Sequence, residues 1–328
     1  MLTALSTESL ARAAALLAAG DVVAFPTETV YGLGADARVG RAVAKIYEIK
    51  QRPSFNPLIV HVKDRLKAEK IAVFNGRARA VADAFWPGPL TLILPLLPGA
   101  GIDPLVSAGL DTVALRVPAH PVAQDLLRMF GGPIAAPSAN RSGRLSPTSA
   151  IHVEQSFGED APFILAAGSS MVGLESTILD LTQADPVILR PGGITPHDLA
   201  GILGAPPPVT HGVVQDGEAA RSPGLLLKHY APAVPLRLRA VDVQADEALL
   251  AFGPTRFMGV VGGGFADDLP DHMIRNLSKT SDLIEAAGNL FRMLYDLEES
   301  GAARIAVMDI PAVGIGMAIN DRLIRAAA

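Results

Sequence analysis

The stretch "VVAFPTETVYGLGADARVGRAVAKIYEIKQR", residues 22–52, decides the fold class. It begins with a short apolar run, "VVAF", which predicts a buried strand. It ends in 38–52, where Val39, Val43, Ile46 and Tyr47 recur at helical spacing. The polar, glycine-containing segment "PTETVYGLG" (26–34) lies between the two and predicts a loop. A strand, a loop and an amphipathic helix in succession favour an α/β fold.

The pattern continues on both sides of this stretch. Further strands are expected at 57–62, 91–96, 112–118, 133–138, 176–182 and 186–190, and helices at 6–20, 78–86, 121–130 and 195–203. Because 176–182 and 186–190 form a hairpin pattern, the sheet is expected to be mixed rather than purely parallel.

A Pro/Gly-rich segment divides the chain. Beyond it we expect strands at 234–240, 257–263 and 304–311, and helices at 244–253, 280–301 and over the last twelve residues. This order predicts a smaller α/β, Rossmann-like domain. The expected division is 1–205 for the first domain, 206–233 for a linker and 234–328 for the second domain.

The composition bounds the class of protein. The net charge of −5 argues against a dedicated nucleic-acid binder, because counterion release from a basic surface supplies most of that affinity. The longest apolar run, "LTLILPLLPGAGI", contains Pro95 and Pro98 and predicts no membrane span. The absence of cysteine excludes disulfides and thiolate chemistry and fits a cytoplasmic protein.

Standard nucleotide and hydrolase motifs are absent: there is no P-loop and no G-x-S-x-G. Instead, polar and basic residues gather in loops at predicted strand ends, where α/β folds build sites. Arginine and lysine there suit phosphate or carboxylate, and the serines, threonines and asparagines suit neutral hydrogen bonding. The basic residues are Lys50, Arg52, Arg116, Arg141 and Arg190.

Each residue alone also has a structural interpretation. Lys50 and Arg52 end a helix, where cations interact favourably with the helix macrodipole. For this pair alone, we slightly favour this structural explanation over a functional one. Ser138 and Asn140 could form a turn, and His61 could be a satisfied core residue. The order in which the motifs occur along the chain carries more weight than any one of them.

That order resembles the YrdC/Sua family of L-threonylcarbamoyladenylate synthases in its long, two-domain form. The matching motifs are "PTETVYGLG", "FWPGPLT", "ESTI", "ILRPG", "SPGLLLKHYAP", "AINDRLIRAA" and the set Lys50, Arg52, Ser138 and Asn140. The resemblance implies that the mixed sheet of the first domain is open and twisted. It implies an enzyme that condenses L-threonine, bicarbonate and ATP to threonylcarbamoyl-AMP and pyrophosphate. It also implies Mg²⁺ with the phosphates, no tightly bound cofactor, and a partner transferase that modifies tRNA.

The resemblance assigns residues to each substrate. On the threonine side it implies Thr29, His61, Arg116, Ala136 and Ser176. On the ATP side it implies Lys50, Arg52, Asn56, Thr112, Ser138, Asn140, Ser146, Arg190 and Tyr230. We hypothesise that Lys50 and Arg52 are catalytic and neutralise the triphosphate.

The resemblance implies that the segment "SPGLLLKHYAP" (222–232) folds back over the nucleotide cavity. Tyr230 and His229 are then expected to close the cavity against water. The alternative is that Tyr230 only packs the linker onto the first domain. Near the C-terminus, Asp309, Asn320, Asp321 and Arg322 are expected to be structural and to hold the lid or a partner.

Two other functions stay open at this point. One is the carbamoyl-transfer module of hydrogenase maturation, which shares the core but normally comes with cysteine zinc motifs that this chain lacks. The other is an RNA-binding or ribosome-maturation module, against which the acidic charge argues.

Overall fold

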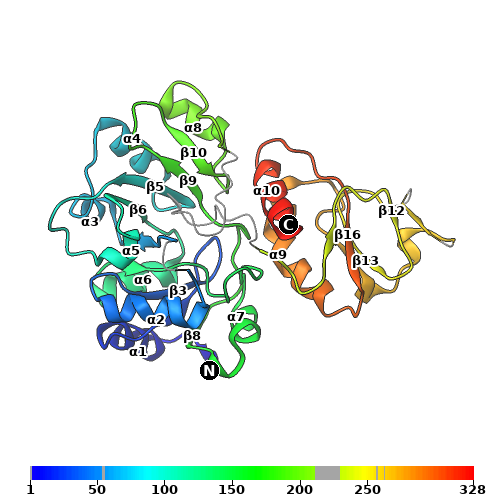
Figure 1. Cartoon of the computed structure of the whole chain (residues 1–328), viewed down its shortest axis with the longest axis horizontal. Coiled ribbons are helices and arrows are strands. Elements are labelled where there is room, and N and C mark those ends of the chain that lie inside the picture. Colours follow the sequence, from blue (N-terminus) through cyan, green and yellow to red (C-terminus); the bar gives the residue numbers. More distant parts are fainter. Residues whose placement is uncertain (1, 54–55, 211–229, 256–257, 262) are drawn as a thin grey trace.

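The computed structural model describes residues 2–53, 56–210, 230–255, 258–261 and 263–328. The chain forms a larger N-terminal part and a smaller C-terminal part that pack side by side (Figure 1). Among the described residues, no helix is both long enough and apolar enough to cross a membrane.

The larger part is built on one mixed sheet, as the sequence predicts. In the order in which they lie side by side, its strands are β1 (Leu2–Ala4), β8 (Phe163–Ala166), β2 (Val23–Phe25), β3 (Gly32–Asp36), β7 (Ile134–Ala135), β4 (Ile59–His61), β6 (Thr112–Arg116), β5 (Leu90–Pro95), β9 (Thr177–Asp180) and β10 (Val187–Arg190). The β9–β10 pair is antiparallel, which confirms the predicted hairpin, whereas β4 and β6 are parallel.

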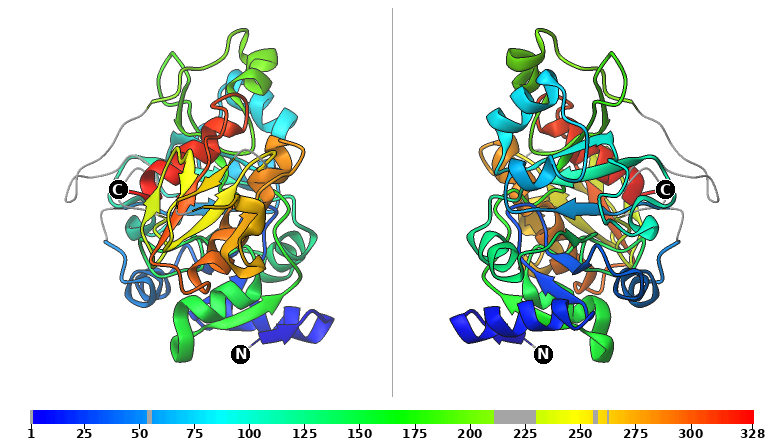
Figure 2. Two further views of the ribbon diagram at one scale, coloured as in Figure 1. Left: turned by 90° about the vertical axis from the view of Figure 1, so that its right-hand side faces the viewer. Right: turned by 90° about the vertical axis from the view of Figure 1, so that its left-hand side faces the viewer.

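Helices cover both faces of this sheet. They are α1 (Thr7–Ala18), α2 (Gly40–Lys50), α3 (Arg65–Ala68), α4 (Gly76–Phe85), α5 (Pro104–Ser107), α6 (Pro121–Phe130), α7 (Ala150–Phe157) and α8 (Pro196–Leu203). Val23 and Phe25 of β2 face the core formed with α1 and α6, while Ala24 between them faces the core on the α2 side. Helices α1 and α8 lie at opposite ends of the sheet in both views of Figure 2.

The smaller part has its own parallel sheet. Its strands are β11 (Leu236–Arg237), β16 (Arg304–Val307), β13 (Glu247–Ala251) and β15 (Ile274–Asn276), and a separate pair is formed by β12 (Asp242–Val243) and β14 (Gly259–Val260). Helices α9 (Leu283–Glu298) and α10 (Gly316–Ala326) lie on the side that faces the larger part (Figure 1). The smaller α/β domain is therefore confirmed, while the predicted domain bounds stay a prediction.

One predicted element of the smaller part is wrong. We expect a helix over 244–253 from its alanine, leucine and glutamate content, but the structure has strand β13 there. All five residues of β13 are buried, between β16 and β15. Burial in the middle of a parallel sheet outweighs helix propensity at this position.

The two parts share a buried apolar contact. Val30, Leu145 and Leu174 of the larger part belong to the same buried cluster as Tyr230 and Phe291. The Tyr295 hydroxyl of α9 also donates to the Leu145 carbonyl oxygen over 2.8 Å. This contact places α9 and α10 against the loops that follow the strands of the large sheet.

Candidate functional site

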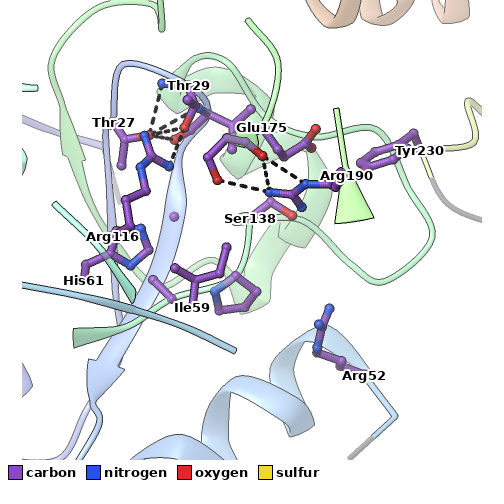
Figure 3. Close-up of a pocket in the computed structure, with 15 residues that line it drawn as sticks. Thr27, Thr29, Arg52, Ile59, His61, Arg116, Ser138, Glu175, Arg190 and Tyr230 are labelled. Atoms are coloured by element: carbon purple, nitrogen blue, oxygen red, sulfur yellow. Dashed lines mark hydrogen bonds between the residues drawn. The ribbon is translucent and has the colours of Figure 1, made fainter. Parts of the chain in front are cut away.

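A pocket opens where loops of the larger part meet Tyr230 (Figure 3). It contains about 520 Å³ of empty space, open solvent at its mouth included. Its lining residues are Thr27, Thr29, Val30, Gly32, Arg52, Ile59, His61, Arg116, Ala136, Pro137, Ser138, Glu175, Ser176, Arg190 and Tyr230. All five residues predicted on the threonine side are among them.

Three neighbouring strands place the polar residues of one wall. His61 of β4 lies opposite Arg116 of β6, and Arg116 lies opposite Thr91 of β5. Since residues in register on adjacent strands project from the same face, these three side chains form a row across the sheet. Thr91 then hydrogen-bonds the Ser176 hydroxyl over 2.7 Å, so the row continues to the start of β9.

Arg116 is held by a buried carboxylate that the sequence analysis did not single out. Its Nη2 donates to Glu28 Oε1 over 2.7 Å, and its Nη1 donates to Thr29 Oγ1 over 2.8 Å. Glu28 Oε2 accepts from the backbone N–H groups of Ala119 and His120. Burial raises the pKa of Glu28, but the charge and hydrogen bond of Arg116 outweigh burial and hold this pKa below its usual value.

The "PTET" segment is a tight turn that orients Thr29. The Thr27 hydroxyl donates to the Val30 carbonyl over 2.6 Å and accepts from the backbone N–H groups of Thr29 and Val30. A threonine side chain that closes its own turn fixes the backbone locally. The Thr29 hydroxyl consequently stays within reach of Arg116 and the pocket.

His61 presents an unpaired ring nitrogen. Its Nδ1 is buried and has no hydrogen-bond partner among the described residues. Burial, and then the charge of Arg116, lowers the pKa of His61 to about 3, so the imidazole is neutral at physiological pH. A neutral, orphaned ring nitrogen that lines a pocket is suited to hydrogen-bond a ligand.

Arg190 forms a second cationic wall. Its guanidinium donates to the Ser176 carbonyl from Nε and Nη2 over 3.2 and 3.0 Å, and to the Ser176 hydroxyl over 3.2 Å. The β9–β10 register shifts between Ile188 and Arg190. Such an irregularity re-aims a side chain, and here it coincides with the residue that reaches the pocket.

Arg52 approaches from another side of the pocket (Figure 3). It follows α2 directly and donates to the carbonyl oxygens of Asn56 and Pro57 over 3.3 and 3.1 Å. Burial lowers the pKa of Arg52 to about 10, which still leaves it charged at neutral pH.

The pocket therefore has positive charge that its own walls do not fully neutralise. In the part of the chain that the structure describes, Arg52 and Arg190 donate only to carbonyl and hydroxyl oxygens. Buried cations without an anionic partner are costly, and an anionic ligand offsets that cost. The arrangement favours a ligand that carries phosphate or carboxylate groups.

The Lys50 ammonium, which we hypothesise to neutralise the triphosphate, contacts a loop of the protein instead of lining the pocket. Its ammonium is buried and donates to the carbonyl oxygen of Ser138 over 2.6 Å and to that of Asn140. Burial, and then the charge of Arg52, lowers its pKa well below the ordinary value. In this structure Lys50 fixes the 138–140 loop and does not line the pocket.

Four other predicted ATP-side residues also lie outside the lining: Asn56, Thr112, Asn140 and Ser146. Both side-chain polar atoms of Asn56, and Oδ1 of Asn140, are buried without a hydrogen-bond partner among the described residues. Ser146 donates to Glu175. Arg52, Ser138, Arg190 and Tyr230 are the predicted ATP-side residues that line the pocket.

Glu175 and Arg322 were not predicted as a pair. Glu175 lines the pocket, and its Oε2 accepts from Arg322 Nε of α10 over 2.7 Å. Arg322 also donates to the Pro191 carbonyl and to Asp321. The structural role expected for Arg322 stays a prediction, and no sequence signal identified its carboxylate partner.

Tyr230 is fully buried and lines the pocket. Its ring packs against Phe291 of α9, with ring centroids 5.7 Å apart, so it contacts the smaller part and not only the larger one. The rest of the predicted lid up to His229 lies outside the described residues. Among those described, no cluster of three or more histidine, aspartate or glutamate side chains could hold a metal ion.

Comparison with known proteins identifies the family. A family model described as "Telomere recombination", which covers Sua5, YciO and YrdC proteins, matches residues 15–192. A second model, described as "Threonylcarbamoyl-AMP synthase, C-terminal domain", matches residues 194–328.

Relatives that match over most of their length are threonylcarbamoyl-AMP synthases. Threonylcarbamoyl-AMP synthase of Bacillus subtilis is 41% identical over 97% of this chain and 92% of its own length. That of Pyrococcus abyssi is 39% identical over 96% of this chain and 92% of its own length. The crystal structure of P. abyssi Sua5 complexed with L-threonine superposes with a TM-score of 0.87 at 32% identity, covering 100% of this chain and 97% of that chain.

Proposed function

Because the chain belongs to the threonylcarbamoyl-AMP synthase family, an enzyme family of the nucleotidyltransferase type, we propose that its pocket forms threonylcarbamoyl-AMP. The substrates are L-threonine, bicarbonate and ATP, and pyrophosphate is released. The observation that carries this proposal is the set of three arginines, Arg52, Arg116 and Arg190, around one pocket.

Threonine is bound at the Arg116 wall. The guanidinium is positioned by Glu28 and Thr29, and it is proposed to bind the amino-acid carboxylate. Thr29, neutral His61 and Ser176 supply hydrogen bonds for the remaining polar atoms of threonine, and Ala136 contributes backbone and a methyl surface. Neutral His61 adds no charge that would compete with Arg116 for the carboxylate.

ATP is bound between Arg52 and Arg190. Arg190 is buried and Arg52 is half-buried, and both donate to neutral oxygens, so triphosphate oxygens would give them an anionic partner. Ser138 and Tyr230 line the same space. The assignments of Asn56, Thr112, Asn140 and Ser146 to ATP are part of this proposal, and the unpaired atoms of Asn56 and Asn140 support theirs.

The chemistry needs positioning more than a strong base. The threonine amine forms a bond to the carbon of bicarbonate, a C–O bond of bicarbonate breaks, and water leaves. The product is a carbamate, whose oxygen already carries negative charge. That oxygen forms a bond to the α-phosphorus, and the bond from the α-phosphorus to the bridging oxygen of pyrophosphate breaks. The leaving oxygen keeps the electron pair, and Arg52 and Arg190 stabilise the charge that develops there.

Mg²⁺ is proposed to enter with ATP, since the described pocket carboxylate, Glu175, is already paired with Arg322. Tyr230 is proposed to close one side of the pocket, which protects a mixed anhydride from water. A transferase partner that passes the threonylcarbamoyl group to tRNA is proposed from the family relationship. The RNA-binding alternative is not favoured, because full-length relatives are synthases.

The test is product identification. Purified protein is incubated with ATP, Mg²⁺, L-threonine and ¹³C-bicarbonate, and the products are analysed by mass spectrometry. The proposal expects threonylcarbamoyl-AMP that carries one ¹³C atom, and its absence from reactions with folded protein would overturn the proposal.

A further inference from the structure

The loop that carries Glu175 is packed between the two parts of the molecule. On one side, the Ser170 hydroxyl donates to the Thr27 carbonyl over 2.9 Å, and the Val172 N–H donates to the Glu28 carbonyl over 2.8 Å. On the other side, a Cβ at Gly173 would lie 2.4 Å from the Ala287 carbonyl oxygen of α9. Helix α9 therefore touches a loop whose other side contacts the threonine wall.

Arg322 makes a second and charged contact from the smaller part. Only 1% of its side chain is exposed, although it is an arginine. Its guanidinium pairs with Glu175, donates to the Pro191 carbonyl over 3.0 Å, and lies 5.1 Å from the centre of the Tyr230 ring. These contacts connect α10 to two residues that line the pocket and to the residue after Arg190.

The charges of two arginines, Arg322 and Arg190, act on the Glu175 carboxylate. It lines the same pocket as Arg190, and the two lie on one side of it with Tyr230 (Figure 3). The residue after it, Ser176, holds Arg190 through its carbonyl and hydroxyl oxygens. After the opposing effect of burial, the charges of Arg322 and then Arg190 lower the pKa of Glu175. Glu175 is thus an anion within the field of both arginines.

We infer that Arg322 is a positioning residue for the synthase reaction: by pairing with Glu175 it leaves Arg190 available for the triphosphate. The inference rests on the proposed function of the pocket. Without Arg322, the buried carboxylate keeps its charge and pairs with Arg190, the other arginine whose charge acts on it. The smaller part then contributes to ATP binding without contacting ATP.

The test compares Arg322→Met, the double variant Arg322→Met/Glu175→Gln and a control variant by calorimetric ATP titration and by steady-state kinetics. Arg322→Met removes the cation at similar length, and we expect ATP affinity to fall about tenfold, with a matching rise in KM for ATP. The KM for threonine should change less than about threefold, since Arg116 has its own carboxylate partner. In Arg322→Met/Glu175→Gln the competing anion is gone, and ATP affinity should return to within about threefold of wild type.

A matched control separates positioning from stability. Arg237 pairs with Glu247, whose side chain is fully buried, but this pair lies within the smaller part and away from the pocket lining. Arg237→Met should lower the melting temperature and leave ATP affinity unchanged. Where Arg322→Met does not fold, Arg322→Lys replaces it, with ATP affinity expected between the wild-type and tenfold-weakened values.

Two results would overturn the inference. One is that Arg322→Met and Arg237→Met weaken ATP binding equally. The other is that the double variant binds ATP no better than Arg322→Met. Failure of the proposed function looks different, because wild-type protein would then form no threonylcarbamoyl-AMP while the ATP titrations still report on Arg322.

Discussion

Arg116 and Glu28 form an ion pair 2.7 Å apart, with only 4% and 5% of their side chains exposed. Their partners differ in kind: Glu28 is also held by two backbone N–H groups, while Arg116 lines the pocket. A carboxylate fixed in this way sets the plane of the guanidinium before threonine arrives. Preorganisation of this kind lowers the ordering cost of binding.

The first prediction concerns the planar guanidinium of Arg116. Arg116→Lys keeps the charge beside Glu28 but loses the planar fork that binds a carboxylate through two parallel hydrogen bonds. We expect KM for threonine to rise about tenfold and KM for ATP to change less than about threefold. Steady-state kinetics with each substrate varied in turn measure both. Arg128→Lys, at an exposed arginine of α6, is the control. Equal changes in the two KM values would contradict the assignment.

The second prediction concerns Arg52. Arg52→Ala removes a half-buried cation that we place on the triphosphate, so kcat/KM for ATP should fall by roughly 10- to 100-fold. Threonine binding, measured by calorimetry without ATP, should be unchanged. Arg41→Ala, at an exposed position of the preceding helix, controls for the loss of any arginine. Turnover that survives Arg52→Ala would show that the triphosphate lies elsewhere.

The third prediction concerns Lys50, which donates to two carbonyls in place of lining the pocket. Lys50→Met leaves these carbonyl oxygens without their donor, so the free energy of unfolding should fall by on the order of 2 kcal/mol. Urea unfolding measures this change. Lys45→Met, at a half-exposed lysine of the same helix, should cost much less.

A role for Lys50 in ATP binding would give a different result. If its ammonium mainly serves the triphosphate, Lys50→Met should leave the free energy of unfolding unchanged and lower ATP affinity. A loss of unfolding free energy with little change in ATP affinity would support the loop-fixing role.

The fourth prediction concerns pH. The unfolded chain binds a proton at His61 near pH 6.5, whereas the folded chain binds it only near pH 3. Between these values the unfolded state holds the extra proton, so the free energy of unfolding falls as pH falls, by about 1.4 kcal/mol per pH unit from this group. This stability contribution is complete above pH 6.5.

Urea unfolding at several pH values between 4 and 6 checks the fourth prediction. The slope of unfolding free energy against pH should be shallower in His61→Gln than in wild type, by about 1.4 kcal/mol per pH unit. His152, whose pKa burial lowers to about 4, is present in both proteins and affects both slopes alike. Identical slopes would mean that folding does not keep His61 neutral.

Much of the fold follows from local sequence pattern. The helix expected at 121–130 is α6 with the same bounds, and the hairpin expected from 176–182 and 186–190 is β9 and β10. Apolar periodicity is strong in these segments, and local preference agrees with the tertiary environment.

Two segments show where local pattern is not enough. Residues 244–253 have helix-forming composition but lie in the middle of a sheet. The glycines of 26–34 predict a loop, yet β3 begins at Gly32. A Cβ at Gly34 would lie 2.7 Å from both the Phe25 ring and Ile134, so this glycine serves close packing within the sheet.

Some residues of the site were predictable from the sequence and others were not. The family resemblance predicts part of the pocket: Thr29, His61, Arg116, Ser176 and Arg190 line it. Five other predicted residues do not line it, namely Lys50, Asn56, Thr112, Asn140 and Ser146. The resemblance does not predict Glu28 as the partner of Arg116, 88 residues away, or Arg322 as the partner of Glu175, 147 residues away. These pairings depend on how strands and domains pack, which neither spacing nor composition encodes locally.

The most direct test of the central claim is pyrophosphate release from ATP by purified protein, with L-threonine and bicarbonate added separately and together. The account predicts release only when both are present, since the carbamate that attacks the α-phosphorus needs both. Release that is independent of threonine, or no release from folded protein, would contradict the claim that this pocket is a threonylcarbamoyl-AMP synthase site.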